Sequence, residues 1–327
     1  MRAYQVQHAG GPEVLQIREI PRPEARPGWV LIREKAFAVN RAEIYKRSGL
    51  PGFEVDFPRV LGLECVGVVE DGSDSGLEPG QKVAALVGGL GRFFDGCYAE
   101  YTLAPASNVI PVKTDLPWET FAAISESFLT AWHCLVDSME VQAGQTLLVR
   151  GGTAALGMAA TTLAKDMGLT VIATTRSQSK VDSVKENGAD HVIIDDGNIA
   201  EKVKELFPEG VNRVLELVGT ATLRDSLQAT APKGVVCNAG ILSVDWELPD
   251  FKPLKDIPSN VRLTAYSSRD VLSAATSAGP LQKIVDGVAA GRLRANVHRV
   301  FNFDQVEEAH RYMESNQASG KLVVKVN

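Results

Sequence analysis

The sequence predicts an α/β fold in which a doubly wound parallel sheet is combined with a β-rich part of the chain. The stretch from Thr146 to Ser177 has the pattern strand, glycine turn, helix and strand, which is one βαβ unit. Strands and helices keep alternating after it, as in a parallel sheet with helices on both faces. The first third of the chain instead has short apolar runs separated by Gly and Pro, which is typical of a small barrel or folded sheet.

The composition is that of a globular protein with room for two cores. At 327 residues the chain is long enough for two domains, and its 45% hydrophobic and 23% charged residues are ordinary values. The net charge of −6 and the lack of a basic cluster argue against a nucleic-acid or anionic-membrane surface. We see neither a signal peptide nor an apolar run long enough to span a bilayer.

The four cysteines predict a reducing compartment. Cys65, Cys97, Cys134 and Cys237 are far apart in the sequence, and no two form a C-x-x-C pair. Free thiols are the simplest interpretation, and they are usual in the cytosol. We therefore expect a cytoplasmic protein.

The expected elements can be taken in chain order. In the first third, strands are expected at 2–6, 15–20, 30–39, 60–70, 82–87 and 97–103. A helix is expected at 118–136. The doubly wound part should have strands at 146–150, 170–175, 191–194, 211–218, 234–238 and 260–267, with helices at 156–167, 180–187, 199–207 and 223–230. The chain should close with a helix at 271–290, a strand at 297–303, a helix at 306–314 and a strand at 321–326.

The glycine turn after the first strand of the βαβ unit is a candidate pyrophosphate site. A helix N-terminus offers unpaired N–H groups and a favourable dipole, and small residues let the backbone approach a phosphate. The pattern departs from G-x-G-x-x-G, and an ordinary βα turn fits it equally well. The candidate contacts are Gly151, Gly152, Thr153, Ala154, Ala155, Leu156 and Gly157.

The end of the second strand favours NADP(H) over NAD(H). NAD-binding chains usually carry an Asp or Glu here for the ribose, whereas this chain has Thr175, Arg176, Ser177 and, one turn later, Lys180. A guanidinium, hydroxyls and an ammonium bind a 2′-phosphate that a carboxylate would repel. The alternative is solvated charge at the start of a helix, where cations are unfavourable without an anion.

Two further strand ends carry glycine. Val218-Gly219 and Ala239-Gly240 end successive strands of the expected sheet. Ligands of open α/β sheets lie beyond the carboxyl ends of the strands, where glycine allows a flat cofactor ring close to the backbone. Plain turn glycines are the alternative.

The β-rich part contains three candidate polar residues. Asn40 follows a strand, and either caps the next helix or takes part in chemistry. Tyr45 offers a phenol that could donate to an oxyanion, or it packs as an amphipathic side chain. Glu64 lies among apolar residues and requires a partner or a cleft; a structural ion pair, perhaps with an Arg, is the simpler interpretation.

A metal site is not expected. The five histidines, His8, His133, His191, His298 and His310, are scattered without ligand spacing. The sequence also has no G-x-S-x-G elbow of a serine hydrolase.

Several motifs occur together in a known order: VNRAEIYKRSG, LGLECVGVV, GGTAALG, GADHVIID and SGKLVVKV. In this order the chain resembles the zinc-free quinone oxidoreductases, related to zeta-crystallin, of the medium-chain dehydrogenase/reductase superfamily. The resemblance implies a GroES-like catalytic domain at 1–118 and 270–327, with a Rossmann domain at 119–269 inserted in it. It also implies NADPH as cofactor, hydride transfer to a quinone or an α,β-unsaturated carbonyl, and a homodimer formed through Asn260–Ser267.

The resemblance also separates this chain from its zinc-dependent relatives. Those relatives carry a catalytic Cys where this chain has Asn40, and a His-Glu pair where it has Leu63-Glu64. A site lacking both of these ligands does not hold tetrahedral zinc. Two departures concern the cofactor: Ala155 replaces the middle glycine of the phosphate turn, and Asp195 replaces a tyrosine near the adenosine end. A carboxylate there is unfavourable beside a 2′-phosphate unless Arg176 or Lys180 neutralises it.

The resulting hypothesis is an NADPH-dependent reductase. Asn40 and Tyr45 would bind the substrate oxygen as it gains negative charge, and solvent would supply the proton. Two alternatives remain: an NADPH-binding structural or redox-sensing protein with little catalysis, and, less favoured, an alcohol dehydrogenase that would require a metal.

Overall fold

The computed structural model describes residues 1–326 and divides the chain into two compact units. The first unit consists of residues 1–129 and 268–291 together with the chain from residue 295 onward. The second unit consists of residues 130–267 together with 292–294. Each unit has its own sheet and its own core, and each is described separately.

The second unit contains the expected doubly wound parallel sheet. Its strands are β9 (Thr146–Arg150), β10 (Thr170–Thr175), β11 (His191–Ile194), β12 (Val211–Glu216), β13 (Thr230–Asn238) and β14 (Arg262–Ala265). They lie in the order β11-β10-β9-β12-β13-β14, and every neighbouring pair is parallel. The order reverses beside β9, so the carboxyl ends of β9 and β12 mark the place where such sheets bind ligands.

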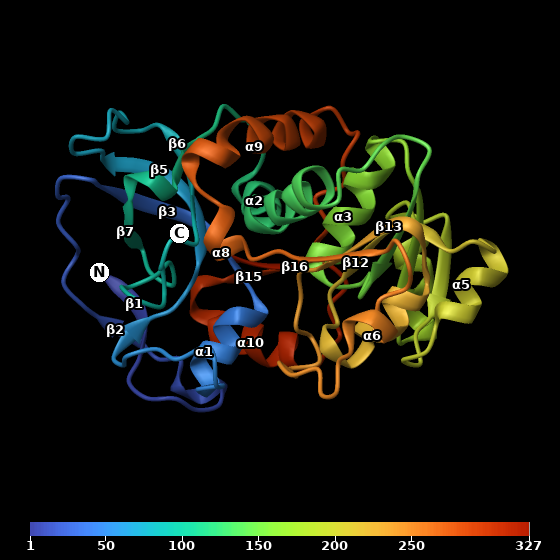
Figure 1. The fold of residues 1–327 in the computed structure, drawn as a ribbon. Coiled ribbons are helices and arrows are strands. Elements are labelled where there is room, and N and C mark those ends of the chain that lie inside the picture. Colours follow the sequence, from blue (N-terminus) through green and yellow to red (C-terminus); the bar gives the residue numbers. More distant parts are fainter. Residues whose placement is uncertain (327) are drawn as a thin grey trace. The chain divides into compact units, whose positions relative to one another are not determined.

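Helices connect these strands (Figure 1). They are α3 (Ala155–Asp166), α4 (Val181–Glu186), α5 (Ala200–Leu206), α6 (Thr220–Gln228) and the short α7 (Pro253–Asp256). Small and apolar residues fill α3, and Gly168, with a φ of 80°, follows its end in a conformation that favours glycine. One apolar core packs against the sheet through residues such as Leu148, Ile172, Val214 and Val236.

The first unit joins both ends of the chain in one sheet. The strands are β3 (Trp29–Val39), β5 (Glu64–Asp71), β6 (Lys82–Leu86), β7 (Tyr101–Pro105), β8 (Val109–Pro111), β15 (Val297–Asn302) and β16 (Lys321–Lys325). Strand β16, at the red end of the colour scale in Figure 1, pairs antiparallel with β3 at the blue end. A smaller sheet has the order β2-β1-β4, from β1 (Arg2–Val6), β2 (Ile17–Glu19) and β4 (Arg59–Val60).

The helices of the first unit include α1 and α10, which a buried histidine joins. The helices are α1 (Arg41–Ser48), α2 (Trp118–His133, continuing into the second unit), α8 (Ser268–Val271), α9 (Ala274–Ala289) and α10 (Val306–Glu314). Arg47 of α1 lies 3.2 Å from Nδ1 of His310 in α10, and Nε2 of His310 lies 3.0 Å from the Tyr98 hydroxyl. Burial, and then the Arg47 charge, lower the pKa of His310 to about 3, so a neutral imidazole fixes α1.

Several predicted elements have other bounds in the structure, and three of them serve as examples. The strand expected at 60–70 is interrupted at 61–63, where Gly62 has a φ of 102°. The helix expected at 271–290 begins only at Ala274, because Ser273 caps it by accepting from the backbone N–H of Thr276, and the short α8 before it was not predicted. The helix expected to reach Thr230 ends at Gln228, and β13 already begins at Thr230. Strand β8 was not predicted.

No helix within residues 1–326 is both long and apolar enough to cross a membrane.

Candidate active site

The glycine turn after β9 is tightly packed against β10. A Cβ on Gly157 would lie 2.4 Å from the carbonyl oxygen of Gly151, so α3 can start here only because residue 157 is glycine. The backbone N–H of Gly152 donates to the carbonyl of Thr174 at 2.9 Å. The first N–H groups of α3, on Ala155 and Leu156, have no acceptor inside the helix and are suited to an anion.

The four residues predicted to bind the 2′-phosphate lie together at the end of β10. Thr175 is its last residue, and the Ser177 N–H donates to the Thr175 hydroxyl at 3.2 Å. Arg176 is exposed and forms no ion pair with any residue in 1–326, whereas Lys180 is half-buried. The strand end therefore presents an uncommitted guanidinium.

Asp195, the carboxylate predicted to disfavour a 2′-phosphate, is turned inward. Only 7% of its side chain is exposed, and it receives two hydrogen bonds from Arg150, at 2.9 and 3.0 Å. Burial alone would raise the pKa of Asp195, but the Arg150 hydrogen bonds and charge hold it below its usual value. The sequence suggested that Arg176 or Lys180 would neutralise this carboxylate; the buried Arg150 does so instead.

Arg150 is the centre of a larger buried network, which we call the β9 network. Its members are Arg150, Thr174, Asp195, Glu216, Asp225 and Ser226. Arg150 also donates to Asp225 at 2.7 Å, and Asp225 accepts the backbone N–H groups of Ile199 and Ala200 at the start of α5. These carboxylates therefore shape backbone turns around the sheet end.

Glu216 of the β9 network determines the shape of one predicted cofactor turn. It accepts the N–H groups of Val218 and Gly219, at 2.7 and 3.1 Å. Burial raises the pKa of Glu216 above its usual value. A Cβ on Gly240 would lie 2.3 Å from the Leu217 carbonyl, so packing of the two strand ends already requires this glycine. Contact of Val218, Gly219, Ala239 and Gly240 with a cofactor stays a prediction.

In the first unit, Asn40 belongs to a second network, which we call the β16 network. Its members are Asn40, Glu64, Ser127 and Lys321. The Lys321 ammonium lies 2.6 Å from Asn40 Oδ1, 2.7 Å from Ser127 Oγ and 2.7 Å from Glu64 Oε1, and Asn40 Nδ2 donates to Glu64 Oε1 at 2.9 Å. Glu64 thus has the ion pair expected for it, with a lysine in place of an arginine. Lys321 and Ser127 were not singled out from the sequence.

Glu43 holds the backbone around this network. It accepts the N–H of Asn40 at 2.8 Å and the N–H of Leu63 at 2.9 Å. Asn40 is the N-cap of α1, as one interpretation of the sequence predicted, and its amide also contacts Glu64 and Lys321. Complete burial raises the pKa of Glu43 to about 7.

Tyr45 lies in the same helix as Glu43. Its side chain is 7% exposed, and its ring packs on Phe53 with centroids 5.0 Å apart. Burial raises the pKa of its phenol, which keeps the hydroxyl protonated at neutral pH. The packing interpretation of Tyr45 therefore applies, and it is compatible with a donor role.

One buried cluster has the residue types of a metal site. Within residues 1–326, ligand atoms of Glu34, Cys65 and Cys97 lie within 4.8 Å of one another. The Thr102 hydroxyl contacts both Glu34 and the Gly96 carbonyl, and one hydroxyl proton cannot serve two acceptors, so a protonated Glu34 completes the pattern. Burial raises the pKa of Glu34 well above its usual value, in agreement. A metal ion bound here would have to displace the protons of the Glu34 carboxyl and the two thiols, because ligands must be deprotonated.

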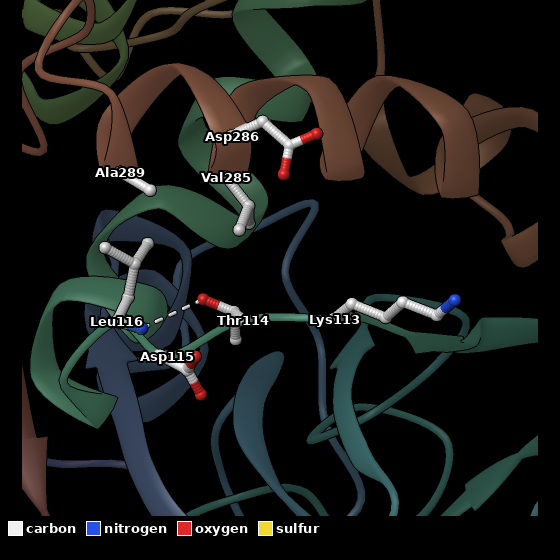
Figure 2. A pocket seen from close by; sticks show the side chains of 7 residues that line it. All are labelled: Lys113, Thr114, Asp115, Leu116, Val285, Asp286 and Ala289. Carbon is white, nitrogen blue, oxygen red and sulfur yellow. Dashed lines mark hydrogen bonds between the residues drawn. The ribbon is translucent and has the colours of Figure 1, made fainter.

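A pocket of about 530 Å³ lies elsewhere in the first unit (Figure 2). It is lined by Lys113, Thr114, Asp115, Leu116, Val285, Asp286 and Ala289. Figure 2 shows these residues on helix α9 and on the segment 113–116, where the Thr114 hydroxyl accepts the N–H of Leu116 at 3.0 Å. None of the residues predicted to act on substrate or cofactor lines this pocket.

Comparison with known proteins identifies the class to which this fold and these residues belong. Residues 26–114 match the model of the alcohol dehydrogenase GroES-like domain, and residues 187–324 match that of the zinc-binding dehydrogenases. The class is therefore an oxidoreductase that combines a GroES-like domain with a Rossmann domain, as the sequence predicted.

Individual relatives narrow this class. The chain is 29% identical to the human (Homo sapiens) quinone oxidoreductase over 333 residues, covering 99% of this chain and 97% of the relative. It is 27% identical to a Burkholderia 2-haloacrylate reductase, with 96% of each covered. A mycobacterial structure complexed with NADPH superposes with a TM-score of 0.88 at 28% identity and covers both chains fully. The chain is similar to proteins of the medium-chain dehydrogenase/reductase superfamily, and the quinone oxidoreductase family of that superfamily fits it.

Proposed function

We propose that this protein is a zinc-independent reductase that transfers a hydride from NADPH to a quinone or an α,β-unsaturated carbonyl. The relatives support the reaction class, since they include quinone oxidoreductases and a 2-haloacrylate reductase of nearly the same length. The observation that carries the choice of NADPH is the pairing of Asp195 with Arg150, which leaves Arg176 as the charge at the end of β10. We propose a GroES-like catalytic domain at 1–118 and 270–327, with a Rossmann domain at 119–269 inserted in it.

The residues present fit NADPH. The α3 N-terminus and the turn from Gly151 to Gly157 would hold the pyrophosphate, and Arg176 with Ser177 and Lys180 would hold the 2′-phosphate. Bound NADPH supplies the hydride from its nicotinamide ring. Asn40 and Tyr45 would bind the substrate oxygen as negative charge develops on it, and such donors are often worth ~3 kcal/mol each.

Asn40 and Leu63 do not provide the ligands of a zinc site. Leu63 offers no ligand side chain, and the only carboxylate of the β16 network already binds the Lys321 ammonium at 2.7 Å. A divalent cation beside Asn40 would face that ammonium across a buried, low-dielectric region. We therefore derive no step through a metal.

The test is NADPH oxidation by purified protein with 9,10-phenanthrenequinone and with a simple enone. Turnover that persists in metal-free protein is expected. Tight NADPH binding without turnover on either acceptor would favour a structural or redox-sensing role instead. Stoichiometric zinc, needed for turnover and found by elemental analysis, would favour an alcohol dehydrogenase.

We also propose a homodimer through Asn260–Ser267. Strand β14 is the last strand of its sheet, and an unpaired strand edge is suited to pairing with a second copy. The Tyr266 N–H donates to the carbonyl of Asn238 in β13. Because backbone N–H groups alternate in direction along a strand, the N–H of the exposed Ala265 points away from β13, towards the free edge.

The substitution Ala265→Pro should therefore convert the dimer to a monomer with an intact fold, because it removes an outward donor and spares the ladder to β13. Analytical ultracentrifugation measures the state, and circular dichroism controls for folding. A folded variant that stays dimeric would remove β14 from the interface. Within residues 1–326 the four cysteines form no disulfide, which supports a cytoplasmic location, and we propose that location as well.

A further inference from the structure

The Lys321 ammonium has no hydrogen left for a ligand. Its side chain is 2% exposed, and its three N–H groups are matched by Asn40 Oδ1, Ser127 Oγ and Glu64 Oε1. An ammonium carries three donors, so all of them are used within the protein. Lys321 can therefore influence a bound molecule only through one of its partners.

Two of these partners, Asn40 and Ser127, keep a donor hydrogen, and Asn40 is the less buried of the two. Its Oδ1 faces Lys321, which accepts nothing, so the amide orientation is fixed with Nδ2 towards Glu64. One Nδ2 hydrogen goes to Glu64 Oε1, and within residues 1–326 the second has no acceptor. Asn40 is only half-buried, in contrast to Lys321 and Glu64.

Lys321 also changes the strength of that donor. A hydrogen bond from a buried cation to the amide oxygen draws electron density from the amide nitrogen, and hydrogen bonds in a chain strengthen one another. Glu64 is fully satisfied as well, because its second oxygen accepts the N–H of Glu126 at 3.0 Å. The Asn40 amide is therefore the half-buried donor of this network on which the Lys321 charge acts.

We propose that Lys321 is a positioning residue that orients Asn40 as a hydrogen-bond donor and polarises its amide towards the substrate oxygen. The proposal rests on the proposed function, in which Asn40 binds that oxygen. A merely structural Lys321–Glu64 pair would hold β16 to β5 and would not need Asn40 to act.

A double-mutant cycle separates these two roles. The variant Lys321→Met/Glu64→Gln removes both charges together, so that neither is left buried alone, and is made with and without Asn40→Ala. With Asn40 present, kcat for NADPH and phenanthrenequinone should fall about ten-fold, with the NADPH Kd unchanged. In the Asn40→Ala background, the same change should lower kcat less than about two-fold. Equal loss in both backgrounds would overturn the proposal.

The matched control is Lys325→Met on the same strand. Lys325 forms a half-exposed ion pair with Glu119 at 3.1 Å, remote from the residues of the β16 network. We expect wild-type kcat from it. If the double variant does not fold, Lys321→Arg takes its place in the cycle, since it keeps the charge and changes the donor geometry.

A second readout needs neither cofactor nor turnover. In protein labelled with ¹⁵N-asparagine, the side-chain signal of Asn40 can be assigned by its loss in Asn40→Ala. It should shift in Lys321→Met/Glu64→Gln and stay in place in Lys325→Met. An unshifted signal would refute the positioning role. Wild-type kcat in Asn40→Ala with a shifted signal would instead refute only the proposed function of Asn40.

Discussion

The β9 and β16 networks are both buried and ionic, yet they use charge in different ways. The β16 network pairs one cation, Lys321, with one carboxylate, Glu64. The β9 network has one cation, Arg150, among three carboxylates, which must also accept backbone N–H groups. The balanced network orients side chains, and the acidic one shapes the backbone turns predicted to bind the cofactor.

This difference has an energetic consequence. In a balanced pair the two charges neutralise each other, so the pair requires few further hydrogen bonds for its stability. An excess of buried carboxylates is stable only if each carboxylate keeps its hydrogen-bond donors. We therefore expect the β9 network to be the more fragile in stability, and the β16 network to matter more for turnover.

The largest effect should come from removing the cation of the β9 network. Arg150→Met leaves Asp195 and Asp225 buried without a counter-charge, and should lower the free energy of unfolding by about 3–5 kcal/mol. Chemical denaturation measures this loss. Arg292→Met is the matched control, because its pair with Asp166 is exposed and worth at most about 1 kcal/mol. Equal losses of unfolding free energy in the two variants would contradict the expected fragility of the β9 network.

The next effect is a pH dependence beside the β16 network. The pKa of Glu43 is raised to about 7 by burial, so the folded state binds a proton that the unfolded state has released. Stability should therefore fall as pH rises from about 4.5 through 7, by up to about 3 kcal/mol in all.

Glu43→Gln should flatten this slope, although it also removes one acceptor at every pH. Unfolding curves at several pH values provide the test. A wild-type slope that survives the substitution would assign the titration to another group.

Tyr45→Phe tests the proposed donor on α1. If the phenol binds the substrate oxygen, turnover should fall by roughly 100-fold, with the melting temperature changed by only a few degrees. Steady-state kinetics and thermal unfolding measure both. Unchanged turnover would contradict the donor role and favour the packing of Tyr45 on Phe53 as its function.

The smallest of these effects concerns cofactor choice. Arg176→Glu should weaken NADPH binding about ten-fold relative to NADH, because a carboxylate would face the 2′-phosphate. The ratio of the two dissociation constants is the measurement, and an unchanged ratio would assign the phosphate preference to other residues. Arg176 is exposed, so folding should be unaffected.

The sequence predicted what local patterns determine. The bounds of β9, β10, β11 and α10 agree with the prediction, because each element lies between turn residues that the sequence displays. The break at 61–63 was missed because Gly62 is surrounded by strand-forming residues. Only the fold shows that a Cβ at this position would collide with Cys97 and Tyr98, which are distant in the sequence.

The partners within the site were beyond the sequence. Glu64 was expected to need a cation, but nothing near it indicates Lys321, since the two belong to β5 and β16. Likewise, the sequence shows Arg150 only as the last residue of a strand. Its ion pairs with Asp195 and Asp225 form through tertiary contacts. Residue types that carry chemistry can be recognised locally, whereas their pairing depends on tertiary contacts.

The position of Lys321 in the chain also has a consequence for biosynthesis. Asn40 and Lys321 are separated by 281 positions. At about 5–20 residues per second, a ribosome takes roughly 15–55 s to cover that interval. During this time the nascent first unit holds Glu64 without its cation, so the orientation of Asn40 is among the last features of the molecule to form.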